Sequence, residues 1–219
     1  MVYNNIINKL HYQMEVQAHG NHYEDLKIRE LTGLGKKEYD KLKKNGYTSV
    51  FDISKGLHSD IDISIKTAKS GAEICTGDIR RMRTHSEYDI IIAQWEQVTP
   101  TKKVFHTEYR FHIKPEHEKL LWGTKTYEEI DEYASKVNSV DYKNPAEVEA
   151  YRTPEKRDAW LEELAWDDNT IMKPRPKVNK AQARVQCAVT IDNLVNSGVE
   201  YSVTPIRIVV DSKPRTFNK

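Results

Sequence analysis

The chain lacks most of the features that mark a secreted, membrane-embedded or disulfide-stabilised protein. Its 219 residues include only two cysteines, Cys75 and Cys187, which lie far apart and form no CxxC motif. A disulfide framework and a structural zinc site are therefore not expected, whereas a reducing, intracellular (cytoplasmic) setting is. No apolar run approaches the length of a membrane span, and the N-terminal residues lack the charged and apolar regions of a signal peptide.

The chain also lacks the GxxxxGK[ST] motif that cradles nucleotide phosphates. We therefore expect neither a nucleotide cofactor nor a membrane partner. What the chain does contain is enough apolar and aromatic material for a core. Hydrophobic residues make up 38% of it, with four Trp, four Phe and twelve Tyr, and this composition argues against disorder.

Charge is segregated along the chain although the net charge is only +1. Residues 36–44, 80–83 and 173–184 are basic, and residues 128–168 are strongly acidic. This distribution suits a protein with one anion-facing surface. For each run taken singly, an ordinary solvated helix face is an equally good interpretation.

The hydrophobic periodicity predicts an α/β (α+β) fold, with a small mixed central sheet flanked by helices. We expect helices over residues 3–31 (with a break at 19–21), 36–43, 78–83 and 115–166, with Asn21, Thr126 and Asn144 as N-caps of the helices that follow them. Strands are expected over residues 48–53, 60–66, 88–95, 103–113 and 201–210, the third and fourth forming a hairpin. Residues 173–176 contain two prolines and are expected to form a stiff linker.

The clearest predicted strand alternates isoleucines with polar residues. In the run from Asp60 to Lys66, every odd position is isoleucine, and Asp60, Asp62, Ser64 and Lys66 occupy the even positions. On a strand the isoleucines enter the core and the polar residues form one row. A half-buried structural strand can show the same alternation. However, strands disfavour aspartate, so two aspartates in this row, with Asp52 nearby, are unfavourable for folding and indicate a function.

Phosphodiester hydrolysis gives such a row a function. Carboxylates from adjacent elements hold Mg²⁺, which polarises the phosphate and lowers the pKa of a water molecule. A lysine on the same strand face can orient that water and offset charge in the transition state. The candidate carboxylates are Asp52, Asp62 and Glu24, and the candidate lysine is Lys66.

These residues resemble the core of the PD-(D/E)xK nucleases. Phe51-Asp52 is followed fourteen residues later by Lys66, and residues 52–56, 64–67 and 77–81 are similar to restriction-type endonucleases, including those of large DNA viruses. The resemblance covers residues from about 20 to 115. Its first acid matches Asp52 and its lysine matches Lys66, but its middle acid falls on Ser64. Either Asp62 or Glu24 then supplies the second carboxylate.

The resemblance implies a Mg²⁺-dependent endonuclease that cuts double-stranded DNA at specific sites. Glu24, Asp52 and Asp62 would hold the metal, Ser64 would shape the site and Lys66 would assist the water. Because a symmetric duplex site is most simply read by a two-fold assembly, we expect a homodimer. Two alternatives stay open: a non-catalytic DNA-binding or regulatory protein on a nuclease-like sheet, and a nuclease specific for DNA junctions.

The expected organisation is a nuclease core over residues 1–172, with a helical insertion at 115–166, and a DNA-reading segment over 173–219 packed on the same domain. Three arginines just after the active-site strand would grip phosphates, or would form an ordinary solvated helix turn. In the C-terminal segment, glutamine suits adenine and arginine suits guanine, provided that the segment is a strand rather than a helix. The predicted DNA-binding residues are Lys55, Arg80, Arg81, Arg83, Lys173, Lys177, Gln182, Arg184 and Gln186.

Overall fold

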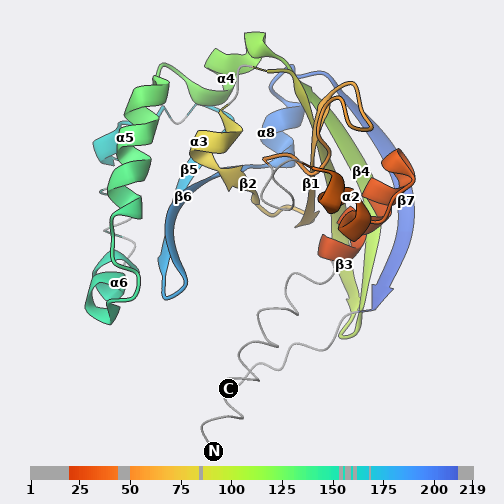
Figure 1. Ribbon diagram of the computed structural model, residues 1–219, viewed down its shortest axis with the longest axis horizontal. Coiled ribbons are helices and arrows are strands. Elements are labelled where there is room, and N and C mark those ends of the chain that lie inside the picture. Colours follow the sequence, from red (N-terminus) through yellow and green to blue (C-terminus); the bar gives the residue numbers. More distant parts are fainter. Residues whose placement is uncertain are drawn as a thin grey trace, which may run out of the picture. The chain divides into compact units, whose positions relative to one another are not determined.

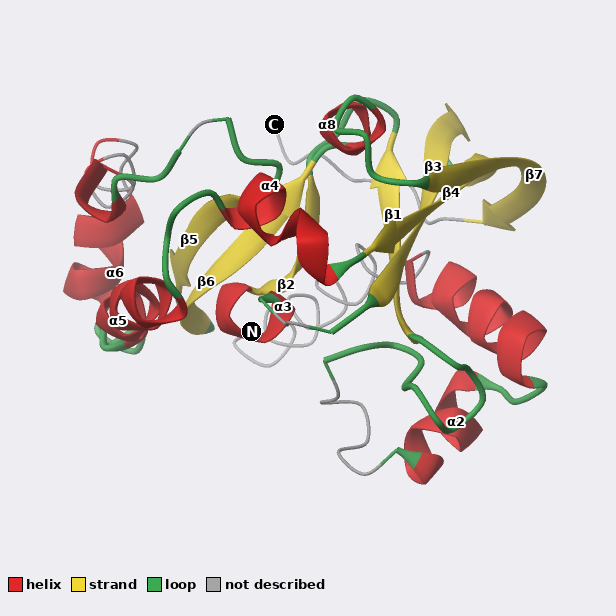
Figure 2. Ribbon diagram, turned by 90° about the horizontal axis from the view of Figure 1, so that it is seen from above, coloured by secondary structure: helices red, strands yellow, loops and turns green. Residues whose placement is uncertain are grey.

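The protein folds into two compact units, each assembled from stretches that are distant in sequence. The computed structural model describes residues 20–43, 50–83, 86–152, 155, 159, 162–167 and 169–211. The first unit comprises residues up to 72, residues 88–112 and residues from 201 onward, and the second comprises residues 73–87 and 113–200. Both units combine a sheet with helices, so the predicted mixed α/β architecture is confirmed (Figures 1 and 2).

A four-stranded mixed sheet forms the first unit. Its strands are β1 (Asp62–Lys69), β3 (Tyr88–Thr99), β4 (Lys102–Ile113) and β7 (Tyr201–Asp211), in the order β1-β3-β4-β7. Strand β1 runs parallel to β3, and β4 runs antiparallel to β7. A two-residue turn joins β3 to β4, as expected for the predicted hairpin.

The isoleucine alternation places β1 against the core of the first unit. Ile63 and Ile65 are buried, together with Tyr23 and Ile28 of the helix over residues 20–32 and Tyr39 of α2 (Lys36–Leu42). The predicted inward row of isoleucines is therefore confirmed for these two, although the strand begins at residue 62 rather than 60. The opposite face of β1 is also covered in part, since the side chain at position 64 is buried as well.

The helix over residues 20–32, called the Glu24 helix below, is held on β4 by polar contacts that are largely shielded from solvent. Its Lys27 ammonium lies 2.9 Å from the Glu108 carboxylate. The Tyr23 hydroxyl donates a hydrogen bond to the same carboxylate, and its ring stacks on Phe105 with centroids 5.0 Å apart. Since a buried cation without a partner would be costly, this contact sets where the helix lies on the sheet.

The second unit contains a three-stranded antiparallel sheet. Its strands are β2 (Ile74–Asp78), β6 (Gln182–Val189) and β5 (Lys173–Asn179), with β6 in the centre. Helices α3 (Ile79–Met82) and α5 (Tyr127–Asn138) contact β6, and α6 (Pro145–Arg152) contacts β5. The remaining short elements are η2 (Pro115–His117), α4 (Glu118–Trp122) and α8 (Ile191–Val195).

Two helices of the second unit begin at the caps predicted from sequence. The Thr126 hydroxyl accepts a hydrogen bond from the Glu129 N–H at 3.2 Å, and the Glu129 carboxylate accepts one from the Thr126 N–H at 2.7 Å. Helix α6 begins at Pro145, directly after Asn144, whose side chain accepts the Ala146 N–H. In the described ranges, no helix has the length and apolar composition needed to cross a bilayer.

Some sequence-based expectations were wrong. Residues 173–176 are not a linker but the start of β5, and prolines are tolerated there because β5 is an edge strand. Consequently the chain does not divide at residue 172, since β5 and β6 share a sheet with β2. Asn21 lies inside a helix instead of capping one. Residues 3–19, and 48–49 of the expected strand 48–53, lie outside the described residues; within 50–53 only Ile53 pairs, through an isolated bridge.

The two cysteines give a test of the second unit. Cys75 is exposed on β2, whereas Cys187 is buried on β6 beside Thr76, and this burial raises the pKa of the Cys187 thiol to about 12. Because the thiolate is the reactive form, we expect iodoacetamide at pH 8 to modify Cys75 and to spare Cys187 in the native protein. Peptide mapping by mass spectrometry measures this directly. Modification of Cys187 at the rate seen in urea would contradict the packing of β6 described here.

Candidate functional site

The site begins at the free edge of β1. Ile53 forms an antiparallel bridge with Ile63, with backbone hydrogen bonds of 3.0 and 2.8 Å. This bridge brings the preceding residue, Asp52, alongside the strand. Its Oδ2 accepts the backbone N–H of Ile65 at 2.6 Å, where a neighbouring strand would otherwise supply a carbonyl. The carboxylate is therefore held by the backbone of the strand that carries Lys66.

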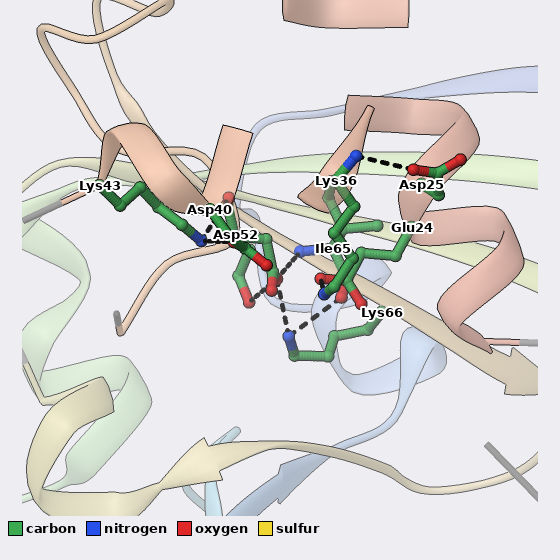
Figure 3. A network of polar contacts seen from close by, with 9 residues as sticks. Glu24, Asp25, Lys36, Asp40, Lys43, Asp52, Ile65 and Lys66 are labelled. Atoms are coloured by element: carbon green, nitrogen blue, oxygen red, sulfur yellow. Dashed lines mark hydrogen bonds and ion pairs between the residues drawn. The ribbon is translucent and has the colours of Figure 1, made fainter. Parts of the chain in front are cut away.

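Lys66 completes this contact from the same strand. Its Nζ lies 3.0 Å from the Asp52 Oδ2 and donates a second hydrogen bond to the Ile65 carbonyl at 3.0 Å. Figure 3 shows the lysine turned toward Asp52. The side chains are 23% and 21% exposed, so both are shielded but reachable from solvent.

Glu24 joins the pair from the Glu24 helix. Its side chain is 15% exposed and forms an ion pair with Lys36, the first residue of α2 (Figure 3). Burial, followed by the charge of Asp52, raises the pKa of Glu24 above its ordinary value, although Lys36 opposes the change. The two carboxylates therefore lie close enough for the charge of one to disfavour ionisation of the other.

Asp52 shows the opposite shift. Burial acts to raise the pKa of its carboxyl, but the Lys66 ammonium and the Ile65 N–H outweigh this effect and hold the pKa below its ordinary value. A hydrogen bond with Glu24 acts in the same direction. Asp52 is thus the carboxylate that stays ionised, and Glu24 is the one that retains a proton longer.

Such a pair of oxygen donors fits a hard divalent cation. A cation between Glu24 and Asp52 would offset the repulsion between their charges that helps to raise the pKa of Glu24, and carboxylates are the donors that Mg²⁺ prefers. Within the described residues there is no group of three or more His, Cys, Asp or Glu side chains placed to hold a metal ion. Mg²⁺ commonly uses one or two protein carboxylates and takes its other ligands from water and phosphate, so two are sufficient.

Asp62 does not join this pair. Its Oδ1 accepts the backbone N–H of Lys55 at 2.8 Å and so closes the turn that leads into β1. Gly56 in that turn has φ +80°, a conformation that favours glycine. Of the two candidates for the second carboxylate, the structure brings Glu24 to Asp52 and gives Asp62 a place in the turn.

Ser64 stands where the PD-(D/E)xK pattern has its middle acid. The residue is 0% exposed, and its hydroxyl donates a long hydrogen bond of 3.5 Å to the Asp52 Oδ2. It therefore lies behind the Asp52 carboxylate, where a third charged group would have little access to water.

Helix α2 holds the loop that carries Asp52, and the sequence analysis missed this role. The Tyr39 hydroxyl accepts the Ser54 N–H at 3.0 Å, and the Lys43 Nζ donates to the Asp52 carbonyl at 3.3 Å. The Lys43 ammonium also pairs with Asp40 at 2.7 Å. The basic run 36–44 was interpreted as an anion-binding or solvated face, but Lys36 pairs with Glu24 of this site, and Lys43 binds Asp40 and the backbone carbonyl of Asp52. The signal available in the sequence was Tyr39, a large aromatic residue amid charges.

Two of the three predicted phosphate-gripping arginines form ion pairs within the second unit. Arg80 lies near Asp78 and Asp131, and the Arg83 guanidinium is nearly buried, 2.9 Å from Glu118. Arg81 is exposed. Arg80 and Arg83 therefore have structural partners, which supports the interpretation of this turn as part of the packing of α3.

Lys55 is exposed in the turn before β1. The other predicted DNA-binding residues lie on β5 and β6: Lys173, Lys177, Gln182, Arg184 and Gln186.

Comparisons with known proteins add no relative: no family model, no curated protein and no solved structure matches the chain. The assignment of the site therefore depends on its own geometry.

The opposite pKa shifts predict opposite effects of neutral substitutions on stability. We expect Asp52→Asn to lower the free energy of unfolding at pH 7 in EDTA by about 1–3 kcal/mol, because Lys66 loses its counter-ion. The folded pKa of Asp52 is depressed, so its contribution is present above the unfolded pKa of about 3.9 and is lost as the pH falls through the folded pKa. The difference from wild type should accordingly shrink below about pH 4.

Glu24→Gln is the matched variant. The folded pKa of Glu24 is raised, so the protonated form is favoured and its contribution is lost as the pH rises through that pKa. We expect this variant to be at least as stable as wild type at pH 7. Urea unfolding followed by tryptophan fluorescence measures the free energy of unfolding of both variants. An equal loss of stability in Glu24→Gln and Asp52→Asn would contradict the coupling between the two carboxylates.

Proposed function

We propose that the protein is a metal-dependent nuclease that hydrolyses phosphodiester bonds of double-stranded DNA. The observation that carries this proposal is the convergence of Glu24, Asp52 and Lys66 at one edge of the sheet. These residues come from a helix, a loop and a strand, and no local feature of the chain requires them to meet. Two carboxylates and a lysine are the groups that metal-assisted phosphodiester hydrolysis needs.

Glu24 and Asp52 are the residues that would hold Mg²⁺. When bound there, the metal polarises the phosphate and lowers the pKa of a water molecule. The Lys66 ammonium, which lies beside Asp52, then orients the water and offsets negative charge as it develops on the phosphate. Asp52 is already ionised and fixed by the Ile65 N–H, so this ligand needs little rearrangement.

Lys36 has a positioning role in this proposal. It neutralises Glu24 in the absence of a cation and keeps the carboxylate directed from the Glu24 helix toward α2. Because Lys36 is half-buried, its ammonium can turn toward solvent when a cation takes its place. Ser64 completes the group by supporting Asp52 from the buried side.

Sequence specificity and a homodimer belong to the same proposal. The described residues of one chain form one such cluster, and cutting both strands of a symmetric site is most simply done by two copies. A nuclease specific for DNA junctions would use the same chemistry, and discrete fragments from linear duplex DNA distinguish the sequence-specific enzyme from it.

A second candidate is a non-catalytic DNA-binding protein on a nuclease-like sheet. It is favoured by the serine at position 64 and by the convergence of only two carboxylates among the described residues. This protein would bind duplex DNA without cutting it under any divalent metal.

The first test removes the lysine. We expect Lys66→Ala to lower the rate of Mg²⁺-dependent cleavage of a large unmethylated DNA by two to three decades, about 2.7–4 kcal/mol, because a transition-state contact is lost. Lys69→Ala is the control, since Lys69 lies at the exposed end of the same strand. Sequencing the fragment ends reports any recognition site. Cleavage by folded Lys66→Ala at the rate of Lys69→Ala would refute the assignment.

A second test distinguishes the two candidate carboxylates. We expect Glu24→Gln to lower the cleavage rate strongly and to raise the Mg²⁺ concentration needed for half-maximal rate, because one of two ligands loses its charge. Asp62→Asn should keep most of the activity, since its amide oxygen can still accept the Lys55 N–H. The reverse result, an inactive Asp62→Asn and an active Glu24→Gln, would show that the second ligand comes from β1.

A further inference from the structure

The three-stranded sheet of the second unit has one apolar and one polar face. Val185 and Cys187 of β6 are fully buried, and the cross-strand partners of these residues are Pro176 and Pro174. Helix α5, which contacts β6, buries four residues of its own, so the apolar face is the covered one. The intervening residues of β5 and β6 point to the other face.

The register between β5 and β6 arranges polar side chains in cross-strand pairs on that face. Asn179 is opposite Gln182, Lys177 opposite Arg184, and Arg175 opposite Gln186. Lys180 lies in the exposed two-residue turn that joins the strands. These seven residues comprise four cations and three amide side chains.

The inner end of this face is closed. Gln186 is only 8% exposed, and the Arg175 guanidinium forms a two-pronged ion pair with Glu73, with one contact at 3.0 Å. Gln186, predicted from sequence to read a base, is therefore not accessible. The outer end of the hairpin, with Lys177, Lys180, Gln182 and Arg184, is the part that a ligand can reach.

At this outer end, two cations stand directly opposite each other. Lys177 is exposed and Arg184 is half-buried, and neither has an acidic partner among the described residues. The Arg184 Nε is buried and lacks a hydrogen-bond acceptor within the described part of the chain. Like charges opposite each other on a sheet destabilise it, so the pair is costly without an anionic ligand.

A ligand that fits this face is duplex DNA. A two-stranded antiparallel ribbon fits the major groove, where the guanidinium of arginine matches the two acceptors of guanine and the amide of glutamine matches adenine. We propose that the outer end of the β5–β6 hairpin enters the major groove, with Arg184 and Gln182 facing base edges and Lys177 and Lys180 facing phosphates. This inference rests on the proposed function for the identity of the ligand as DNA.

The experiment measures binding without cleavage. Duplexes preferred by the wild-type chain are first selected from a randomised pool in EDTA, and fluorescence anisotropy then compares a selected duplex with a scrambled one at several salt concentrations. Lys177→Ala should weaken binding to both duplexes and lower the slope of log K against log salt by about 0.9. Arg184→Ala should lose roughly 5- to 150-fold in affinity for the selected duplex and much less for the scrambled one.

Two further variants serve as controls. Arg184→Lys keeps the charge but loses the two-pronged guanidinium. It should therefore lose the preference for the selected duplex while retaining the slope of log K against log salt. Lys136→Ala removes an exposed lysine of α5, paired with Glu163 in the same unit, and should bind like wild type. Circular dichroism establishes that each variant is folded.

The inference is overturned if Lys177→Ala and Arg184→Ala bind both duplexes like Lys136→Ala, if selection yields no preferred sequence, or if single-stranded DNA competes as well as the duplex. The proposed nuclease function can fail separately. Binding that depends on Arg184, with no cleavage under any divalent metal, would support DNA binding by the β5–β6 hairpin and contradict the proposed nuclease function. Cleavage that depends on Lys66, with no effect of the hairpin variants, would support the nuclease function and contradict DNA binding by the hairpin.

Discussion

The hydrogen bond between the Ile65 N–H and the Asp52 carboxylate is the contact on which the candidate site depends. Strand β1 lies at the edge of its sheet, and its outward backbone groups need partners. The bridge from Ile53 supplies hydrogen-bond partners for the backbone of Ile63, and the Asp52 side chain accepts the backbone N–H of Ile65. A requirement of the backbone thus fixes a carboxylate beside Lys66, and the free edge of the strand becomes the place where charged groups gather.

The second carboxylate reaches this edge through a different set of constraints. The Glu24 helix is fixed to β4 by the contacts of Tyr23 and Lys27 with Glu108, more than eighty residues away in sequence. Helix α2 then holds the Asp52 loop from the other side through Tyr39 and Lys43. The geometry of the acidic pair is therefore set by the whole first unit, and its opposed pKa shifts are a property of the fold rather than of either residue.

The sequence predicted the features that depend on local pattern. Alternating isoleucines identified β1, the β3–β4 hairpin followed from its turn, and Thr126 marked the start of α5. The contact between Asp52 and Lys66 was also predicted from the sequence, because the spacing of these two residues resembles that of the nuclease core. The sequence could not choose between Glu24 and Asp62, since this depends on which carboxylate the Lys55 N–H engages. It also missed the role of α2, whose lysines have the same pattern as a solvated helix.

Strand β5 illustrates how an apparent defect in a sheet limits its growth. Pro174 and Pro176 have the same parity along the strand, and their neighbours Lys173, Arg175 and Lys177 share the other. In an antiparallel edge strand, alternate residues direct their backbone groups outward, and the two prolines stand at outward positions without an N–H to offer. No further strand can hydrogen-bond in register along this stretch. The sheet therefore does not extend beyond β5 along this stretch, and neither a second copy nor an unfolded chain finds a template at this edge.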